Sequence, residues 1–288
     1  MAVSAPSPAR AGRARPRVGT ALAYLVLAVG ALAALFPFAW MLLTSLKTFQ
    51  ELFDLSFWPA SPTAANYAQV LGQTAFLRWF GNSLLVAGLS TLSVLVFDSL
   101  AGYTLAKFDF PGKNLIFVLI LATLMIPTEM LVIPWYVGTV GLGLPRTPPG
   151  AYLSILFPGL MSAFGVFLMR QFFQSLPNDL LEAARVDGMS ELGIFARVAL
   201  PLVRPALASL GIFTFLGNYN AFLWPLVVIQ QPQYRTLPVG VALFSGEAGT
   251  QWGLIMAAST LAVVPVLIVF AVFQKQIIEG IALTGLKG

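Results

Sequence analysis

Long apolar stretches recur along the whole of this sequence and leave few positions for charge. Of the 288 residues, 58% are hydrophobic and only 9% are charged. Soluble domains carry about 25% charged residues, so this chain lacks the polar side chains that would cover a water-exposed surface. Apolar runs near the ~20 residues that cross a hydrocarbon core therefore predict an all-α protein that crosses a bilayer several times.

Six stretches are long and apolar enough to be read as membrane-spanning helices. Their expected limits are residues 18–46, 82–106, 114–136, 151–172, 206–229 and 253–273. The sequence begins with a segment rich in Ala, Pro and Arg, which is typical of a disordered tail. The pattern predicts a cytoplasmic tail, residues 1–19, followed by one six-helix membrane domain, residues 20–288.

The distribution of lysine and arginine predicts how the chain is oriented in the membrane. If the N-terminus lies inside and six helices follow, all but four of the 16 basic residues fall on the inner side. The four exceptions are Lys47, Arg78, Arg146 and Arg235. The positive-inside rule describes such an excess. We therefore expect a multi-pass protein of the cell (inner) membrane with both termini in the cytoplasm.

One long polar interval, residues 177–205, interrupts the apolar pattern between the fourth and fifth expected spans. Pro177 suits the first turn of a helix, and Gly188 suits its end, where a left-handed residue is often needed. Ser190 is a suitable cap for a second short helix. The expected orientation places both helices in the cytoplasm, where they would form a compact projection for a groove on another protein.

The second short helix is expected to bury one apolar stripe. Leu192, Phe195, Ala196 and Ala199 follow the i, i+3, i+4, i+7 spacing of a single helix face. Pro201 then ends the helix, because proline cannot continue the hydrogen-bond pattern.

A spaced motif runs through this polar interval. Glu182–Ala184 read Glu-Ala-Ala, Gly188 follows after three residues, and Val198–Pro201 follow after nine more. This spacing resembles the EAA loop of ABC-type importer permeases, with valine at 198 in place of the usual isoleucine. The resemblance implies that the loop docks into a cleft of an ATP-hydrolysing subunit and transmits its motion. The residues it assigns to this coupling are Glu182, Ala183, Ala184, Asp187, Gly188, Leu192, Phe195, Leu200 and Pro201.

Further segments, in the same order along the chain, resemble permeases of the carbohydrate-uptake type. They include residues 82–84, residues 125–129 and residues 218–226, the last with Tyr219 in place of Trp and Ala221 in place of an acid. The resemblance is to the second permease of maltose and glycerol-phosphate systems. It implies a type I ABC importer permease fold with four kinds of contact: a second permease subunit, two cytoplasmic ATP-binding subunits, an extracytoplasmic solute-binding protein and the lipid bilayer.

Five polar or aromatic residues in the expected spans are candidates for the solute pathway. They are Glu129, Asn218, Tyr219, Asn220 and Trp224. Sugars suit such surfaces, because amides pair with hydroxyl groups and aromatic faces stack on sugar rings. Hydrogen bonds between helices explain the four residues of the 218–224 segment slightly better, and for Glu129 the two explanations are even, so both interpretations stay open. Asp98 also lies within an expected span, and for this residue a structural hydrogen bond is the better explanation.

The composition excludes several other functions. The chain has no Cys and no His, which removes thiolate metal sites and the commonest general base. It has no phosphate-binding G-x-x-x-x-G-K-[ST] sequence, so we expect no enzyme activity, no bound cofactor and no nucleic-acid partner. An ion-coupled secondary transporter is the alternative function, for which Asp98 and Glu129 are the only candidate coupling acids.

Overall fold

The computed structural model describes residues 18–54, 56–246 and 249–285, and these residues are mostly helical. The longer helices are α1 (Val18–Ser45), α2 (Ala65–Gln73), α3 (Phe76–Lys107), α4 (Lys113–Thr123), α5 (Thr128–Gly141), α6 (Pro148–Leu156), α7 (Ala163–Gln174), α8 (Asn178–Val186), α11 (Arg204–Tyr219) and α14 (Trp252–Gly285). Short α-helices are α9 (Glu191–Ile194), α10 (Leu200–Leu202), α12 (Leu223–Val228) and α13 (Leu237–Ala242).

The remaining elements are short. Single 3₁₀ turns are η1 (Gln50–Phe53), η2 (Leu144–Arg146), η3 (Phe157–Gly159) and η5 (Pro232–Tyr234), and η4 (Phe195–Ala199) is a π-helical turn. Strands β1 (Ser245–Gly246) and β2 (Gly249–Thr250) pair antiparallel. An all-α fold is therefore confirmed, apart from this one hairpin.

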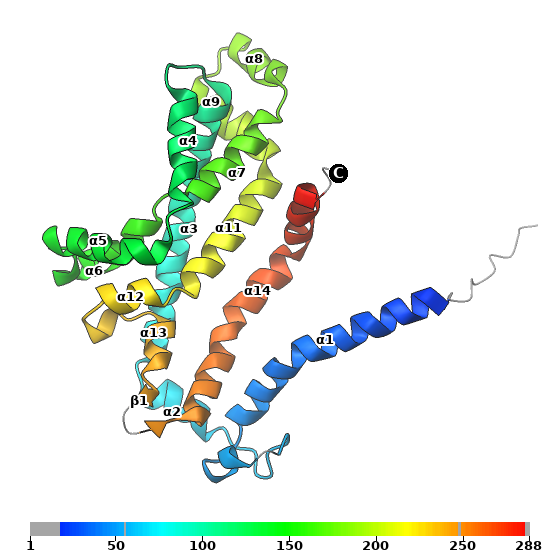
Figure 1. The fold of residues 1–288 in the computed structure, drawn as a ribbon, viewed down its shortest axis with the longest axis vertical. Helices are drawn as coiled ribbons and strands as arrows, with labels where there is room; N and C mark the ends of the chain where they lie inside the picture. Colours follow the sequence, from blue (N-terminus) through cyan, green and yellow to red (C-terminus); the bar gives the residue numbers. More distant parts are fainter. Residues whose placement is uncertain (1–17, 55, 247–248, 286–288) are drawn as a thin grey trace, which may run out of the picture.

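Helix α3 is the axis of the bundle, and α7 and α11 pack along it (Figure 1). Helix α8 lies at one end of the bundle, and α2 and β1 lie at the opposite end (Figure 1). Close packing of α3 on α7 depends on Gly102, because a Cβ there would lie 2.7 Å from the Met169 Cβ and 2.8 Å from the Arg170 backbone nitrogen. Small residues at helix contacts are common in membrane proteins, where they let two backbones approach.

Helix α1 leans away from the bundle and meets it only near its C-terminal end (Figure 1). There the side-chain amide of Asn66 in α2 donates to the backbone oxygens of Ser45 and Lys47, at 2.9 and 3.0 Å. Pro37 lies inside α1 without ending it. Residues 1–17, most of the predicted tail, lie outside the described residues.

The structure contains three unbroken helices that are long and apolar enough to cross a membrane, and up to six crossings if bent helix pairs are counted, within the described residues. The three are residues 19–45, 76–107 and 252–274. The second begins six residues before the expected limit at 82, and α14 continues beyond the expected limit at 273. Six crossings agree in number with the expectation, but three of the expected spans are not continuous.

The third expected span, residues 114–136, is broken. Helix α4 ends at Thr123, and α5 begins at Thr128 with its axis turned by 100°. Pro127 explains the break, because it lacks an N–H and disfavours helical backbone in the preceding residue. Helix α5 therefore projects to one side with α6 instead of crossing alongside α3 (Figure 1).

The fourth and fifth expected spans are broken too. Residues 148–159 meet α7 at 55°, and Pro158 lies in η3, just before the break. Helix α11 ends at Tyr219 and α12 begins only at Leu223. Pro225 contributes to this second break, because it cannot donate the backbone hydrogen bond that would continue α11 through residue 221.

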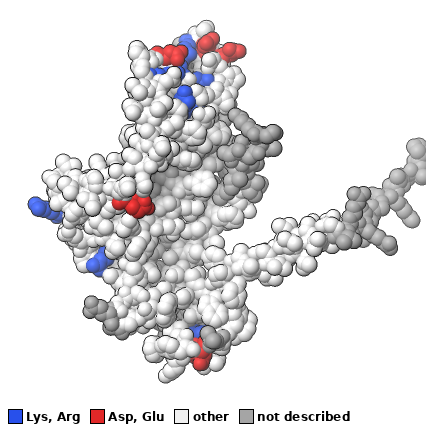
Figure 2. Space-filling view, viewed as in Figure 1, with Lys and Arg blue, Asp and Glu red and all other residues white. Residues whose placement is uncertain are grey.

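Charged side chains gather at the α8 end of the molecule, smaller groups lie on the projecting side and at the opposite end, and white, uncharged surface covers most of the remainder (Figure 2). This separation is expected of a protein whose middle section lies in hydrocarbon, where an isolated charge is costly.

Candidate functional site

Helix α8 begins the polar unit at the end of the bundle. Pro177 is its N-cap instead of its first helical residue, a correction of one position. Asp179 lies in the first turn and Arg185 in the last, where each sign of charge complements the helix dipole. Leu181 and Ala184 point into the bundle, so the opposite side of α8 is left at the surface.

The turn after α8 has the form of a Schellman motif. The Gly188 N–H donates to the Arg185 oxygen at 3.0 Å, and the Met189 N–H donates to the Ala184 oxygen, also at 3.0 Å. This pattern requires a left-handed residue, and Gly188 has φ of +78°. A Cβ at this position would have no heavy atom within 4 Å. The backbone conformation, and not a lack of space, is therefore what the glycine supplies.

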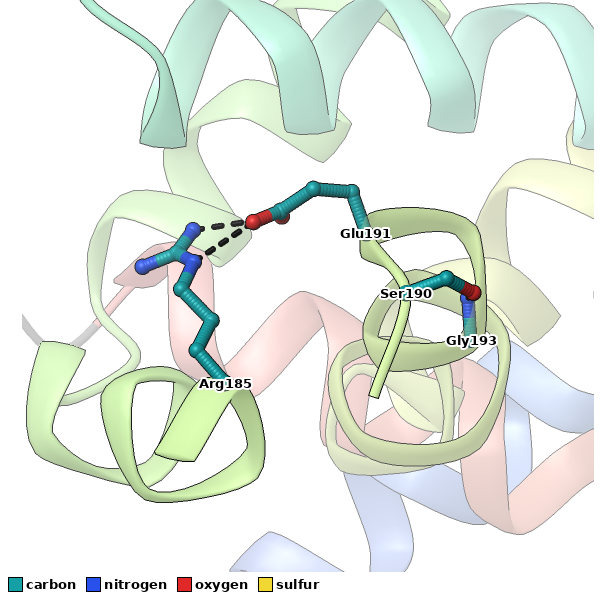
Figure 3. Close-up of polar contacts among 4 residues, drawn as sticks. All are labelled: Arg185, Ser190, Glu191 and Gly193. Carbon is teal, nitrogen blue, oxygen red and sulfur yellow. Dashed lines mark hydrogen bonds and ion pairs between the residues drawn. The ribbon is translucent and has the colours of Figure 1, made fainter. Parts of the chain in front are cut away.

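Helix α9 begins at a capped serine and is bound to α8 by an ion pair. The Ser190 hydroxyl accepts from the Gly193 N–H at 3.2 Å, as predicted for the cap. Figure 3 shows Arg185 reaching across to Glu191, with Nε 2.6 Å from Oε1 and Nη2 3.2 Å from Oε2. This hydrogen bond lowers the pKa of Glu191 and raises that of Arg185.

The helix after this pair lies across the end of the bundle. Residues 191–202 (α9, η4 and α10) meet α11 at 83°. We call residues 178–202, from α8 to α10, the α8–α10 unit. The expected stripe on its second helix is only half right. Phe195 and Ala199 are buried, but Leu192 and Ala196 are exposed. Ile194 is buried as well, and the wider π-helical turn from Phe195 to Ala199 lets Ile194 and Ala199, five positions apart, share the buried side.

An aromatic cluster joins the α8–α10 unit to the bundle. The Phe195 ring lies 5.2 Å from the Tyr103 ring of α3 and 6.2 Å from the Phe173 ring of α7, centroid to centroid. Lys107 at the end of α3 adds a polar connection, because its Nζ donates to the Leu176 oxygen and to Asn178 Oδ1, both at 2.7 Å. The α8–α10 unit is therefore in direct contact with both α3 and α7.

The nine residues that the motif assigned to coupling divide between two faces. Glu182, Ala183, Asp187, Gly188 and Leu192 are at the surface, while Ala184, Phe195, Leu200 and Pro201 are buried or half-buried.

The outer face also includes residues that sequence reasoning missed. Val186 is 87% exposed and Leu180 is 47% exposed, beside Leu192 at 68%. Val186 follows Glu182 by four residues and Ala183 by three, which is the spacing of neighbours on one helix face, so the sequence itself indicated that Val186 lies beside them.

The structure does not gather the five candidate pathway residues into one place. The Tyr219 hydroxyl donates to the Ala262 oxygen at 2.9 Å, and the Trp224 Nε1 lies 3.1 Å from the Ser154 oxygen. Both side chains therefore make contacts between helices. Glu129 is exposed in the first turn of α5.

The two asparagines beside them line different cavities. Asn218 borders a cavity of about 510 Å³ between α3, α5, α7 and α11, together with Ser162 and Thr214. Asn220 borders another, of about 280 Å³, next to Tyr219 and α14. Of the five candidates, Asn218 alone lines the larger cavity.

Asp98 has a structural role that fits the interpretation favoured from the sequence. It is fully buried in α3, and both carboxylate oxygens lie 3.1 Å from the Ser162 N–H at the start of α7. A carboxylate at a helix N-terminus is stabilised by the helix dipole. Gly165 makes room for it, because a Cβ at that position would overlap the carboxylate.

These features define a multi-pass membrane protein whose broken apolar helices carry one polar helical unit at one end. The sequence pattern of the family described as binding-protein-dependent transport system inner membrane component matches residues 98–282. The chain belongs to this family. Its members are permease components and not enzymes, so the expectation that this chain is not an enzyme is confirmed. Members of the family are integral inner-membrane proteins.

Individual relatives agree with this assignment. The arabinooligosaccharides transport system permease protein AraQ of Bacillus subtilis is 37% identical over 94% of this chain and 96% of its own. The trehalose/maltose transport system permease protein MalG of Thermococcus litoralis is 33% identical over 90% and 93%. The predicted resemblance to carbohydrate-uptake ABC permeases is confirmed, and membership of this family favours an ABC importer over an ion-coupled transporter.

A solved structure supports the fold. A chain of a bacterial ABC transporter involved in the import of the acidic polysaccharide alginate superposes with a TM-score of 0.80, covering 94% of this chain and 99% of that one at 24% identity. The predicted type I permease fold is therefore confirmed.

Proposed function

We propose that the chain is one permease subunit of an ATP-driven importer, forms half of a solute pathway, and is moved through the α8–α10 unit. The support is the two-sided construction of this unit. Its outer face presents Val186 and Leu192 to solvent beside Glu182, and its inner face packs Phe195 on α3 and α7. Exposed aliphatic side chains on a short amphipathic helix are typical of a helix that docks into a groove.

In this proposal the unit works as a rigid lever. A pair of cytoplasmic ATP-binding subunits closes on ATP and carries α8 with it. The Arg185–Glu191 pair and the Ser190 cap hold α8 and α9 together during this displacement. The aromatic contacts of Phe195 then pass the displacement to the spans. The same orientation places both termini in the cytoplasm, as the positive-inside rule indicates.

The proposed solute is a sugar or a related polyol. Relatives that cover most of this chain are named for arabinooligosaccharides and for trehalose and maltose. Asn218, Ser162 and Thr214 supply amide and hydroxyl groups to the larger cavity, and such groups pair well with sugar hydroxyls. A second permease would complete the pathway, and an extracytoplasmic binding protein would deliver the solute.

The observation that carries the proposal is the 87% exposed side chain of Val186 on a helix with a buried opposite face. Because Val186 is 87% exposed, Val186→Glu should leave the fold intact while placing a carboxylate in the proposed apolar contact. Retention of the ATP-binding subunits on the purified chain should fall by at least about tenfold, because burying an unpaired charge costs more than ~1.4 kcal/mol.

The matched control is Leu71→Glu, which changes an exposed aliphatic residue of α2 at the opposite end of the bundle. This variant should keep the ATP-binding subunits. Equal retention by the Val186→Glu and Leu71→Glu proteins would count against docking through α8.

A further inference from the structure

Arg170, near the C-terminal end of α7, has more hydrogen-bond donors than the protein satisfies. Its guanidinium carbon lies 3.9 Å from the centre of the Phe117 ring in α4, and its Nε lies 3.3 Å from the Leu105 oxygen. A guanidinium carries five N–H donors. Among the described residues, the bond from Nε is the one hydrogen bond that this guanidinium makes. The stacked, half-buried group is therefore held in place with most of its donors unused.

These donors border a cavity of about 380 Å³ at the α8 end of the bundle. Its other polar boundaries are Lys113, Asn114 and Asp109. The Lys113 Nζ lies 3.0 Å from Asp109 Oδ1, but the Asp109 side chain is fully exposed. Such a surface pair contributes little, so an anion of higher charge density could replace the aspartate. Two cations then face one cavity.

Helix α4 adds to the positive potential of this cavity. It begins at Lys113 directly after Gly112, which has φ of +81°, and no side chain caps its first turn. The free N–H groups of a helix N-terminus favour an anion. This contribution is secondary to the two side-chain cations, because it acts over a short distance only.

The surface next to the cavity is apolar and follows α4 away from the α8 end. Leu115 borders the cavity, and Val118 and Leu119 continue the exposed apolar side of the helix. A soluble anion gains no binding energy from an apolar surface, whereas a lipid acyl chain packs against it and buries it.

We propose that this cavity binds the phosphate group of an anionic phospholipid, with its acyl chains along α4. The planar fork of Arg170 fits two phosphate oxygens, and Lys113 supplies a second charge. Basic pockets between membrane helices on the cytoplasmic side are known to suit such head groups. The bound lipid fastens α4 to α7 beside Lys107, which is hydrogen-bonded to the first residue of α8.

The test is lipid retention by the full-length chain, purified in detergent and measured by native mass spectrometry. The probes are phosphatidylglycerol and phosphatidylcholine at equal concentration. The wild-type chain should retain phosphatidylglycerol in preference. Lys113→Gln and Arg170→Gln should each lower its retention about fivefold. The control Arg146→Gln, which changes an exposed arginine on a different turn, should retain it like the wild type.

Two further measurements separate loss of the site from misfolding and a lipid site from a site for soluble anions. Among the described residues, the Lys113 side chain makes one hydrogen bond, to the fully exposed Asp109, so Lys113→Gln tests the site even if changing Arg170 impairs folding. Inorganic phosphate is added as a competitor at millimolar concentration. The proposal is overturned if both variants retain phosphatidylglycerol as the wild type does, if phosphatidylcholine is retained equally, or if inorganic phosphate displaces the lipid, which would indicate a site for soluble anions.

Discussion

Replacing Gly188 by alanine tests how much the turn geometry of the α8–α10 unit matters. Gly188 has φ of +78°, and a Cβ there would meet no atom within 4 Å. The whole cost is therefore conformational, about 1–2 kcal/mol for a non-glycine residue in the left-handed region. Such a cost corresponds to a change of roughly 5–30-fold in an equilibrium. In the free Gly188→Ala chain the turn can relax out of the left-handed region, and it must return to it on docking, so we expect ATP-binding subunits to bind this chain more weakly by up to that factor.

The experiment compares three variants by binding of the ATP-binding subunits and by solute uptake in reconstituted vesicles. Gly188→Asn should lose less than Gly188→Ala, because asparagine tolerates the left-handed region. Gly143→Ala is the matched control, since Gly143 has φ of +69° with no atom within 4 Å of a Cβ but lies outside the α8–α10 unit. The reasoning is refuted if Gly188→Ala behaves like Gly143→Ala.

Substitutions at three other positions have distinct expected outcomes. Arg185→Gln should weaken binding of the ATP-binding subunits less than about fivefold, since a half-exposed pair is worth ~0.2–1 kcal/mol. The pair lowers the pKa of Glu191, so its contribution is complete above the ordinary glutamate pKa and is lost as pH falls through the lowered value. Measuring binding over a pH series would detect this loss. Tyr219→Phe removes one hydrogen bond to α14 and should cost ~0.5–1.5 kcal/mol of stability without changing the KM for solute; a raised KM would place the hydroxyl in the pathway. Asp98→Leu should destabilise the chain by ~1–3 kcal/mol, whereas Asp98→Asn keeps an acceptor and should lose less in thermal unfolding.

The local features of the polar unit were predictable because short-range chemistry decides them. A left-handed turn needs Gly188, and a helix start favours Ser190, whatever lies around them. The face of the second helix was not predictable in the same way. The π-helical turn from Phe195 to Ala199 places Ile194 and Ala199 on the same buried side, and nothing in the periodicity indicates that turn.

The breaks in the apolar spans had a visible cause that hydropathy alone overlooks. Pro127, Pro158 and Pro225 each lie at or next to a break, but proline is also tolerated inside α1 at Pro37. Neighbouring helices decide which of these residues ends a helix. The same breaks explain why Asn218 and Trp224, six positions apart, have different surroundings.

The α8–α10 unit is proposed to lie in the cytoplasm against an ATP-binding subunit. The chain contains no cysteine, so Val186→Cys introduces a single reactive thiol at an exposed position. We expect a membrane-impermeant maleimide to label it in inverted vesicles stripped of ATP-binding subunits, and those subunits to protect it when added back. Labelling from outside intact cells, or labelling that the subunits do not change, would contradict the account.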